Sequence, residues 1–252
     1  MIKVGAVSYL NTKPLIYGFE HGHMQDEVKL VIDYPANIAA LLENDEIDIG
    51  LIPVAAIAEL ETPEIISDFC IGSDGEVASV CLFSDVPLNE IETVLLDYQS
   101  RTSVELLKIL MTEHWQVAPK LLKGDKDYEK QISGTTAGLV IGDRALEQRS
   151  KSKYIYDLGL AWKAMTGLPF VYAAWVSNKK LPAGFLADFN KANALGLVSI
   201  DIIVEQQQNK LYDLNLYFTQ NISYRFDGHK KEGMQLFLNK ITAKQKTVAA
   251  AG

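Results

Sequence analysis

Short apolar segments alternate with polar turns and helix starts along most of the chain. Five segments have the length and apolar content of buried strands, and they cover residues 2–7, 47–52, 94–97, 138–142 and 170–176. A polar turn and the start of a helical pattern follow each of the first four. This alternation predicts an α/β fold with largely parallel sheets. Because ligands bind beyond the carboxyl ends of the strands in such sheets, we expect the functional residues in the turns after these strands.

Apolar residues at helical spacing predict helices between and after the strands. These helices begin at Lys13 and at Thr102, and others cover residues 36–43, 54–60, 143–146, 158–165, 183–195, 212–219 and 228–241. Thr102 and Glu105 stand three residues apart and fit a capping box, which predicts a helix start there. Gly167 suits the position just after a helix end. Residues 222–226 are compatible with either a linker or a strand.

The composition is that of a folded globular protein. Of the 252 residues, 48% are apolar and 22% are charged, which excludes a disordered chain and a coiled coil. The 24 basic and 32 acidic residues give a net charge of −8, and this balance argues against a surface for nucleic acid or for an anionic membrane. It does not exclude a small carboxylate ligand, because helix N-termini hold such groups through local dipoles.

The sequence shows neither a membrane span nor a metal-binding pattern. The longest stretch without charged side chains, residues 164–178, is shorter than the ~20 apolar residues that a span needs. The chain enters its first strand without a secretion signal, so we expect a cytoplasmic protein with reduced, buried thiols at Cys70 and Cys81. His21 and His23 could form a metal pair, but an imidazole at a helix end complements the dipole, and we favour that structural role. We therefore expect no metal, no cofactor and no obligate protein partner.

The turn after the first apolar segment carries three small polar residues ahead of a helix, namely Ser8, Asn11 and Thr12. A cap formed by Asn11 or Thr12 contributes ~1 kcal/mol to a helix, but it accounts for one polar residue and not for three. A helix N-terminus with free N–H groups and neighbouring hydroxyl and amide donors also binds carboxylates. The spacing is equally compatible with a cap and with an anion site.

The same pattern recurs at a second helix start, at Ser100, Arg101, Thr102 and Ser103. A cap is again the alternative to a site, with Arg101 solvated or paired. Two such turns in one chain could hold two carboxylates from opposite sides. The sequence thus offers polar turns that suit anions, and it offers no evident strong base.

Two further turns carry candidate polar residues. Ser79 adjoins an apolar strand, and we expect its hydroxyl to point into a cleft; the alternative is that the glycine-rich residues 72–80 form only a hairpin or crossover turn. This turn matches neither a P-loop nor the dinucleotide-binding fingerprint. Asp143 follows Gly142 and either caps its helix or pairs with Arg144, and we favour the cap.

Five blocks of sequence, these turns among them, resemble the chorismate dehydratases, the first enzymes of the futalosine route to menaquinone. In family order the blocks lie at residues 4–15, 48–54, 100–103, 141–146 and 166–172. The resemblance implies a type II periplasmic-binding-protein-like fold, with two α/β lobes, two crossovers and a ligand cleft between the lobes. Lobe one is then expected at residues 1–86 plus 178–252, and lobe two at residues 87–177. The final third of the chain carries none of the family's motifs.

The reaction that the resemblance implies is a hydro-lyase step from chorismate to 3-[(1-carboxyvinyl)oxy]benzoate and water. Under this hypothesis Thr102 and Ser103 bind one carboxylate together with the N–H groups of their helix. The N-terminal turn contacts the other carboxylate or the leaving hydroxyl, and Ser79 lies over the ring edge. Asn11 and Ser79 are the expected catalytic residues, and the proton goes to the substrate's own enolpyruvyl carboxylate. The expected substrate-binding residues are Ser8, Tyr9, Thr12, Ser100, Arg101, Thr102, Ser103, Gly142 and Asp143.

Two alternatives share the expected fold. A solute-binding protein of a transporter needs an export signal or a lipid anchor, and the sequence shows neither. The enzyme that makes 1,4-dihydroxy-6-naphthoate in the same pathway carries a catalytic histidine, whereas none of the four histidines here stands in a turn after a predicted strand. The dehydratase is therefore the favoured hypothesis.

Overall fold

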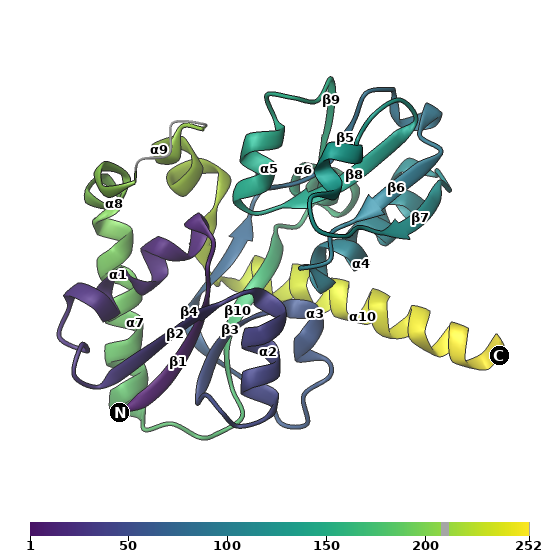
Figure 1. Cartoon of the computed structure of the whole chain (residues 1–252). Coiled ribbons are helices and arrows are strands. Elements are labelled where there is room, and N and C mark those ends of the chain that lie inside the picture. Colours follow the sequence, from purple (N-terminus) through teal and green to yellow (C-terminus); the bar gives the residue numbers. More distant parts are fainter. Residues whose placement is uncertain (208–211, 252) are drawn as a thin grey trace. The chain divides into compact units, whose positions relative to one another are not determined.

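The computed structural model describes residues 1–207 and 212–251 of the chain. Its contacts divide the chain into two compact units, whose elements are labelled in Figure 1. Unit 1 comprises Met1–Gly72 and Val171–Asp227, and unit 2 comprises Ser73–Phe170 and Gly228–Gly252. Each unit contains one mixed β-sheet with its own helices.

The sheet of unit 1 has six strands in the order β11-β4-β10-β3-β1-β2. The strands are β1 (Ile2–Val7), β2 (Val28–Asp33), β3 (Ile49–Pro53), β4 (Glu64–Ser73), β10 (Phe170–Ser177) and β11 (Ser223–Arg225). Strand β1 runs parallel to β2 and β3, whereas β10 is antiparallel to β3 and β11 is antiparallel to β4. Every residue of β3 and β10 is buried, so these two strands form the centre of the sheet.

The sheet of unit 2 has five strands in the order β7-β6-β8-β5-β9. The strands are β5 (Val80–Ser84), β6 (Thr93–Leu96), β7 (Lys120–Lys123), β8 (Thr136–Ile141) and β9 (Tyr154–Asp157). Strand β6 runs parallel to β7 and β8, and β5 is antiparallel to β8 and β9.

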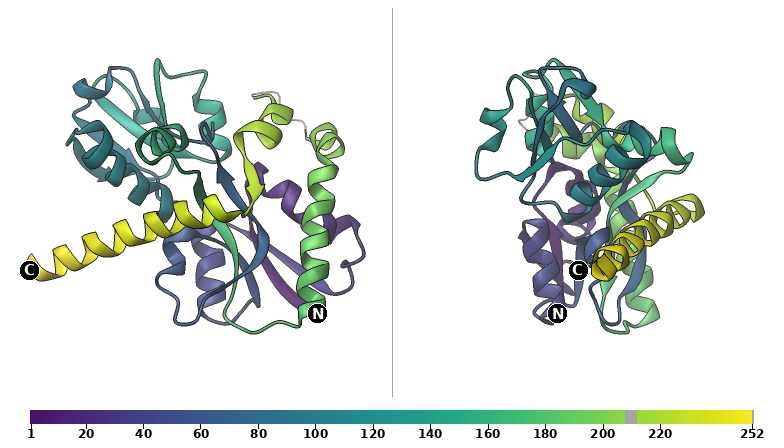
Figure 2. Two further views of the ribbon diagram at one scale, coloured as in Figure 1. Left: turned by 180° about the vertical axis from the view of Figure 1, so that it is seen from behind. Right: turned by 90° about the vertical axis from the view of Figure 1, so that its right-hand side faces the viewer.

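Helices of both units flank these sheets. Those of unit 1 are η1 (Leu10–Thr12), α1 (Lys13–His21), α2 (Pro35–Glu43), α3 (Val54–Ile57), α7 (Ala183–Val198), α8 (Ile200–Gln206), α9 (Leu214–Leu216) and η5 (Tyr217–Asn221). Those of unit 2 are η2 (Leu88–Glu90), α4 (Arg101–Leu110), η3 (Met111–Trp115), η4 (Tyr128–Gln131), α5 (Asp143–Gln148), α6 (Leu158–Thr166) and α10 (Gly228–Ala251). Figure 2 shows α10 as one long yellow helix.

An aromatic cluster lies in the core of each unit. In unit 1, Trp175 of β10 packs edge-on against Phe19 of α1 and Phe189 of α7, with ring centroids 6.1 and 5.1 Å away. In unit 2, Trp162 of α6 packs edge-on against Phe170 and against an aromatic ring of α10. Both tryptophans are fully buried. Because aromatic side chains bury the largest apolar areas, these clusters join α1 and α7 to β10 in unit 1 and α6 to α10 in unit 2.

The two sheets repeat one arrangement of strands. In each, one strand lies between two parallel neighbours, β1 in unit 1 and β6 in unit 2. An antiparallel strand lies beyond one of these neighbours, β10 in unit 1 and β5 in unit 2. In unit 2, Val80 at the start of β5 pairs with Ile141 at the end of β8. The carboxyl ends of the parallel strands β6 and β8 meet at the same edge of the sheet. This register brings Ser79 to the same edge as the candidate turns after β6 and β8.

The structure confirms the α/β class and all five predicted strands. Residues 222–226 contain a strand, β11, rather than a linker. The sheets are mixed rather than largely parallel, because β5 and β10 run against their neighbours. The apolar pattern does not predict β2, β4, β7, β9 or α8. Strand β7 shows why, since an edge strand with mostly exposed side chains has no apolar run to reveal it.

The unit boundaries differ from those expected for the lobes. Residues 73–86 belong to unit 2 because β5 pairs with β8 and β9. Residues 171–177 belong to unit 1 because β10 pairs with β3. Helix α10 belongs to unit 2, where Phe237 packs against Trp162. The chain therefore passes from one unit to the other after Gly72, Phe170 and Asp227, once more than expected.

Two glycines of α7 give a matched test of the packing between α1 and α7. A methyl group at Gly196 would lie 1.7 Å from the carbonyl oxygen of Pro14, whereas one at Gly184 meets nothing within 4 Å. We expect Gly196→Ala to destabilise the protein by at least ~1–3 kcal/mol, because the backbones of two helices must separate. Gly184→Ala should stabilise it by about 0.5 kcal/mol through the lower entropy of the unfolded chain. Thermal unfolding of both variants measures the difference, and equal melting temperatures would contradict this packing.

Candidate functional site

The turn after β1 leads into α1 through the 3₁₀ turn η1. Asn11 and Thr12 are buried there, with exposed fractions of 8% and 0%. No side chain caps either η1 or α1, so the cap that the spacing allowed is not formed. The nearest polar contact of the two side chains is with each other, at 3.5 Å between Thr12 Oγ1 and Asn11 Oδ1. The side-chain amide nitrogen of Asn11 is thus left without an acceptor among the described residues.

Tyr224 of β11 fixes this turn from a distant part of the sequence. Its buried phenol donates a hydrogen bond to the carbonyl oxygen of Asn11 at 3.0 Å. Burial raises the pKa of Tyr224 well above its ordinary value, so the phenol stays protonated and remains a donor. Nothing in the local sequence around Tyr224 points to this role, and sequence reasoning missed it. Ser8 is exposed and Tyr9 is half-buried at the start of the same turn.

In unit 2, Ser100 is the N-cap of α4. Its Oγ accepts a hydrogen bond from the backbone N–H of Ser103 at 3.0 Å. The helix begins at Arg101, so the capping box expected at Thr102 and Glu105 is wrong. Ser100, two residues before Thr102, supplies the acceptor, and its β-region backbone is the one that an N-cap needs.

The first turn of α4 has the properties of an anion site. Thr102 and Ser103 are buried, with exposed fractions of 2% and 3%, whereas Arg101 is exposed. The first backbone N–H groups of a helix have no partner within the helix, and they carry the positive end of its dipole. Two buried hydroxyl residues beside these groups suit a small anion such as a carboxylate.

Ser79 and Gly142 are joined at the same edge of the unit 2 sheet. The N–H of Gly142 donates to the carbonyl oxygen of Ser79 at 2.8 Å. Ser79 is fully buried, and its hydroxyl lies 3.5 Å from the carbonyl oxygen of Val77. Gly142 has φ 63° and ψ −148°, a conformation that essentially only glycine adopts. Ala78 has φ 62°, which is uncommon for a residue with a side chain.

The carboxylate of Asp157 supports this turn. The N–H groups of Val77 and Ala78 donate to it at 3.1 and 2.8 Å, and the N–H of Leu160 donates at 3.0 Å. Burial raises the pKa of Asp157 above its ordinary value, although these three donors lower it. The Cys81 thiol lies 3.5 Å away, and burial and the Asp157 carboxylate raise its pKa, so it stays a neutral thiol.

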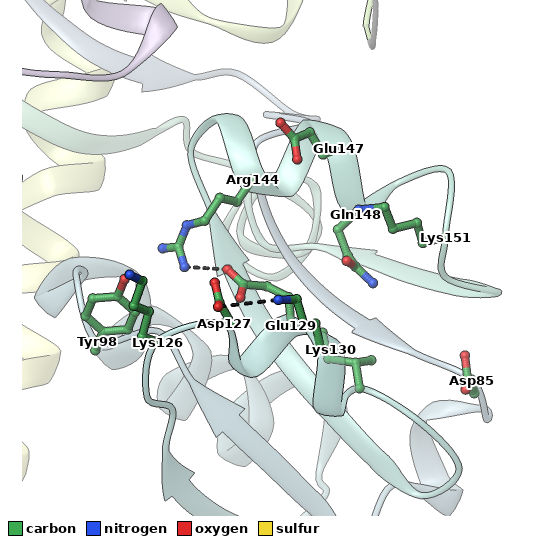
Figure 3. Close-up of a pocket in the computed structure, with 11 residues that line it drawn as sticks. Asp85, Tyr98, Lys126, Asp127, Glu129, Lys130, Arg144, Glu147, Gln148 and Lys151 are labelled. Carbon is green, nitrogen blue, oxygen red and sulfur yellow. Dashed lines mark hydrogen bonds and ion pairs between the residues drawn. The ribbon is translucent and has the colours of Figure 1, made fainter.

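Asp143 does not cap α5, which corrects the expectation from sequence. The guanidinium of its neighbour Arg144 donates to three other acceptors. Nη2 of Arg144 donates to Asp97 Oδ2 at 2.8 Å and to Gln99 Oε1 at 2.9 Å. Nη1 donates to Glu129 of η4, as the dashed line in Figure 3 shows. Arg144 therefore ties the turn after β6 to η4.

Asp97, directly after β6, is the buried centre of this network, with an exposed fraction of 3%. Besides Arg144, its Oδ2 accepts from the Tyr128 hydroxyl at 2.9 Å and from the Ile141 N–H at 3.3 Å. Its Oδ1 accepts from the Gln99 N–H at 2.8 Å. Burial raises the pKa of Asp97, whereas Arg144 and these donors lower it.

Sequence reasoning missed Asp97 and its partners. One signal was present, because an aspartate that ends an apolar strand segment needs partners if it is buried. The partners themselves have no signal in the local pattern, since Tyr128 lies 31 residues and Arg144 lies 47 residues further along the chain.

Arg144 also lines a cavity of about 480 Å³ within unit 2 (Figure 3). The other residues of its wall are Asp85, Tyr98, Lys126, Asp127, Glu129, Lys130, Ile132, Glu147, Gln148 and Lys151. Its basic and acidic side chains balance in number, so the cavity has no marked preference for an anion. None of the site residues predicted from the sequence lines it.

The remaining residues that the sequence singled out have structural contacts. The ring of His21 stacks on Tyr17 at 4.3 Å, and its Nδ1 lies 3.1 Å from the Tyr17 carbonyl oxygen. Cys70 and Cys81 are buried thiols that are not joined in a disulfide, as expected. Within the described ranges, no three His, Cys, Asp or Glu side chains gather as metal ligands do. No helix in those ranges is both long enough and apolar enough to cross a bilayer.

The profile of the family described as "Menaquinone biosynthesis" matches residues 2–243 of the chain. The chain belongs to this family. This chain is 25% identical to the chorismate dehydratase of Thermus thermophilus in an alignment of 257 positions that covers 93% of each chain. It is 34% identical to the chorismate dehydratase of Campylobacter jejuni over 113 residues, which cover 43% of this chain and 44% of that protein.

Solved structures with low sequence identity share the fold. A protein of Archaeoglobus fulgidus superposes with a TM-score of 0.69 at 13% identity, covering 97% of both chains. The alkanesulfonate-binding protein SsuA of Xanthomonas axonopodis pv. citri, solved with MOPS, gives 0.64 at 11% identity, with 97% of this chain and 93% of SsuA covered. This chain therefore has the periplasmic-binding-protein fold that the sequence resemblance implied.

Buried Asp157 predicts a measurable pH dependence of stability. Its pKa in the folded protein lies above the ordinary value of 3.8, so the fold favours the neutral carboxyl. The free energy of unfolding of wild type therefore decreases as the pH rises from the ordinary pKa of Asp157 to its pKa in the folded protein. Asp157→Asn is neutral throughout, so the melting temperature of wild type relative to this variant should fall as the pH rises above about 4.

Asp188→Asn is the control for this measurement. The pKa of Asp188 is lowered by its hydrogen bond and ion pair with Lys191, so wild type should gain slightly on this variant as the pH rises from acid. A pH-independent offset between wild type and Asp157→Asn would contradict the role of Asp157 burial.

Proposed function

We propose that this member of the menaquinone-biosynthesis family is a chorismate dehydratase, a hydro-lyase that converts chorismate to 3-[(1-carboxyvinyl)oxy]benzoate and water. The observation that carries the proposal is the similarity to the Thermus thermophilus chorismate dehydratase, which extends over 93% of both chains. The turns after β1 and β6 support it, because both present polar groups suited to carboxylates and chorismate has two.

The chemistry suits a protein whose candidate turns contain no strong base. The C4–O bond breaks and the hydroxyl leaves, the C3–H bond breaks and the proton is lost, and the two departing groups make one water. The ring becomes aromatic, which supplies the driving force. The protein then has to position the dicarboxylate, exclude water and stabilise the charge on the leaving oxygen.

In unit 2, the first turn of α4 would bind one carboxylate of chorismate. The N–H groups of Arg101 and Thr102 in this first turn and the hydroxyl of Ser103 would be the donors. The Ser103 N–H donates to the Ser100 Oγ, so Ser100 shapes the turn, and its own O–H would be a further donor to the anion. Because Thr102 and Ser103 are buried, the bound carboxylate would be shielded from water and held strongly.

In unit 1, the turn with Ser8, Tyr9, Asn11 and Thr12 would contact the other carboxylate or the leaving hydroxyl. Asn11 is the main candidate for a donor to the leaving oxygen, because its amide nitrogen has no acceptor among the described residues and its carbonyl is fixed by Tyr224. A donor that is held in place before the reaction stabilises developing negative charge most effectively.

Ser79 is the second catalytic candidate, and Gly142 and Asp143 would complete the substrate contacts beside it. The Gly142 N–H to Ser79 hydrogen bond keeps the turn before β5 next to the turn after β8. The hydroxyl of Ser79 would then lie over the ring edge of the substrate.

The proton from C3 would go to the enolpyruvyl carboxylate of the substrate. Two buried carboxylates of unit 2 are engaged elsewhere: Asp97 accepts from Arg144 and Tyr128, and Asp157 accepts from three backbone N–H groups. Their oxygens are occupied by these donors, although burial raises the pKa of both carboxyl groups. The enolpyruvyl group is attached at C3 through its ether oxygen, so its carboxylate is carried by the same molecule close to the departing proton.

Purified protein mixed with chorismate, without added metal or cofactor, tests the proposal. We expect catalytic loss of the cyclohexadiene absorbance and a product lighter by one water. Binding without turnover would instead favour a solute-binding role, and neither binding nor turnover would remove chorismate as the substrate.

Alanine variants of the two catalytic candidates test the assignment of residues. Asn11→Ala and Ser79→Ala should each lower kcat/KM by about 10²–10³, because loss of one preorganised donor costs ~2.7–4 kcal/mol in the transition state. Ser84→Ala is the matched control, since Ser84 is equally buried at the other end of β5. If Asn11→Ala and Ser79→Ala both keep the kcat/KM of the control, neither residue is catalytic.

A further inference from the structure

Arg144 links three segments of unit 2 that are far apart in sequence. It lies in the first turn of α5, and its guanidinium reaches Asp97 and Gln99 after β6 and Glu129 of η4. Each of the two terminal nitrogens donates to a different segment, so both arms of the guanidinium are used. The planar fork of arginine makes this possible, and a lysine ammonium lacks that geometry.

The charge of Arg144 is already compensated. Its two partners Asp97 and Glu129 are carboxylates, and both lie within ion-pair distance. Its guanidinium also lies 5.4 Å from the ring centre of Tyr98 and 5.8 Å from that of Tyr128. Two carboxylates and two ring faces surround the guanidinium of Arg144 and neutralise its charge. We therefore do not expect Arg144 to bind a substrate carboxylate.

The segment that Arg144 holds is the one that leads into α4. Gln99, its acceptor, directly precedes Ser100, and Ser100 caps the helix through the Ser103 N–H. Asp97 holds the same turn from the other side by accepting from the Gln99 N–H at 2.8 Å. Arg144 and Asp97 together thus fix the backbone of residues 97–100, and this backbone sets where the first N–H groups of α4 point.

We propose that Arg144 is a positioning residue for the carboxylate-binding turn of α4: it contacts no substrate and acts by holding Asp97 and Gln99. The inference rests on the proposed function for its kinetic consequence, because the turn is where chorismate would bind. Its structural part, that Arg144 keeps residues 97–103 in a fixed conformation, does not depend on the substrate.

Arg144→Lys is the decisive variant. It keeps a positive charge beside buried Asp97, so the protein should fold, but a single ammonium does not span Asp97, Gln99 and Glu129 at once. We expect KM for chorismate to rise about tenfold or more with a smaller change in kcat, since a carboxylate contact made equally in ground and transition state appears in KM. Arg144→Gln should raise KM further.

Lys240→Gln is the matched control. It removes another ion pair of unit 2, with Glu113 of η3, and leaves the turns after β6 and β8 untouched. Its KM and kcat should equal those of wild type. If Arg144→Lys and Lys240→Gln both change only the melting temperature, Arg144 is structural and the proposal is wrong.

A double-mutant cycle with Ser100→Ala shows whether Arg144 acts through the α4 turn. If it does, most of the KM effect of Arg144→Lys is lost in the Ser100→Ala background, because the turn is already disordered there. Fully additive effects would contradict the proposal.

Hydrogen exchange separates this inference from the proposed function. Amides of residues 97–103 should exchange faster in Arg144→Lys than in wild type or Lys240→Gln, with no substrate present. If wild type does not convert chorismate but this exchange result holds, the proposed function fails and the positioning role stands. Unchanged exchange would overturn the positioning role whatever the activity.

Discussion

The burial of the Asp97 carboxylate is the constraint on which the architecture of unit 2 depends. A carboxylate with an exposed fraction of 3% needs partners for its charge, because an unpaired buried charge costs several kcal/mol. Those partners come from elements spread over the unit: the turn after β6, η4, the end of β8 and α5. Satisfying one side chain therefore fixes how four elements meet at the carboxyl edge of the sheet.

The two units solve the same problem by different means. Each sheet has a polar turn after the strand that lies between two parallel neighbours, β1 or β6, and each turn leads into a helix. In unit 2 a charged network and the Ser100 cap hold that turn. In unit 1 no side chain caps the helix, and a single phenol, that of Tyr224, holds the Asn11 carbonyl. The uncapped turn leaves Asn11 and Thr12 available for a ligand, which is consistent with the catalytic role proposed for Asn11.

The sequence was informative where chemistry is local. Buried strands such as β1 and β8 show as apolar runs, and Gly167 ends α6 in the left-handed conformation expected of it. It was less informative at exposed edges, where β7 has no apolar run. The capping box at Thr102 was wrong because a serine two residues earlier fits the cap geometry better, and adjacent polar residues cannot be ranked without the backbone. Asp143 failed as a cap for the same reason.

The candidate site residues likewise divide into those that the local sequence predicts and those whose roles depend on the fold. Ser79, Ser100 and Gly142 could be found because they occupy turns beside strand ends, which the apolar pattern locates. Asp97 was visible only as an aspartate at a strand end, and Arg144 only as the neighbour of Asp143. Their pairing depends on strand order, since β6 and β8 are adjacent in the sheet but separated along the chain by β7 and η4. The hydrogen bond from Tyr224 to Asn11 depends likewise on the position of β11 in its sheet, and no local sequence pattern predicts it.

The central claim is that two polar turns, one in each unit, bind the substrate. The most direct measurement is a crystal structure of the protein with 3-[(1-carboxyvinyl)oxy]benzoate bound. We predict one carboxylate on the N–H groups of the first turn of α4, with Asn11 in contact with the ligand and Arg144 still paired with Asp97. A product molecule held in the cavity lined by Lys126 and Lys151, without contact to Asn11 or to the first turn of α4, would contradict the account.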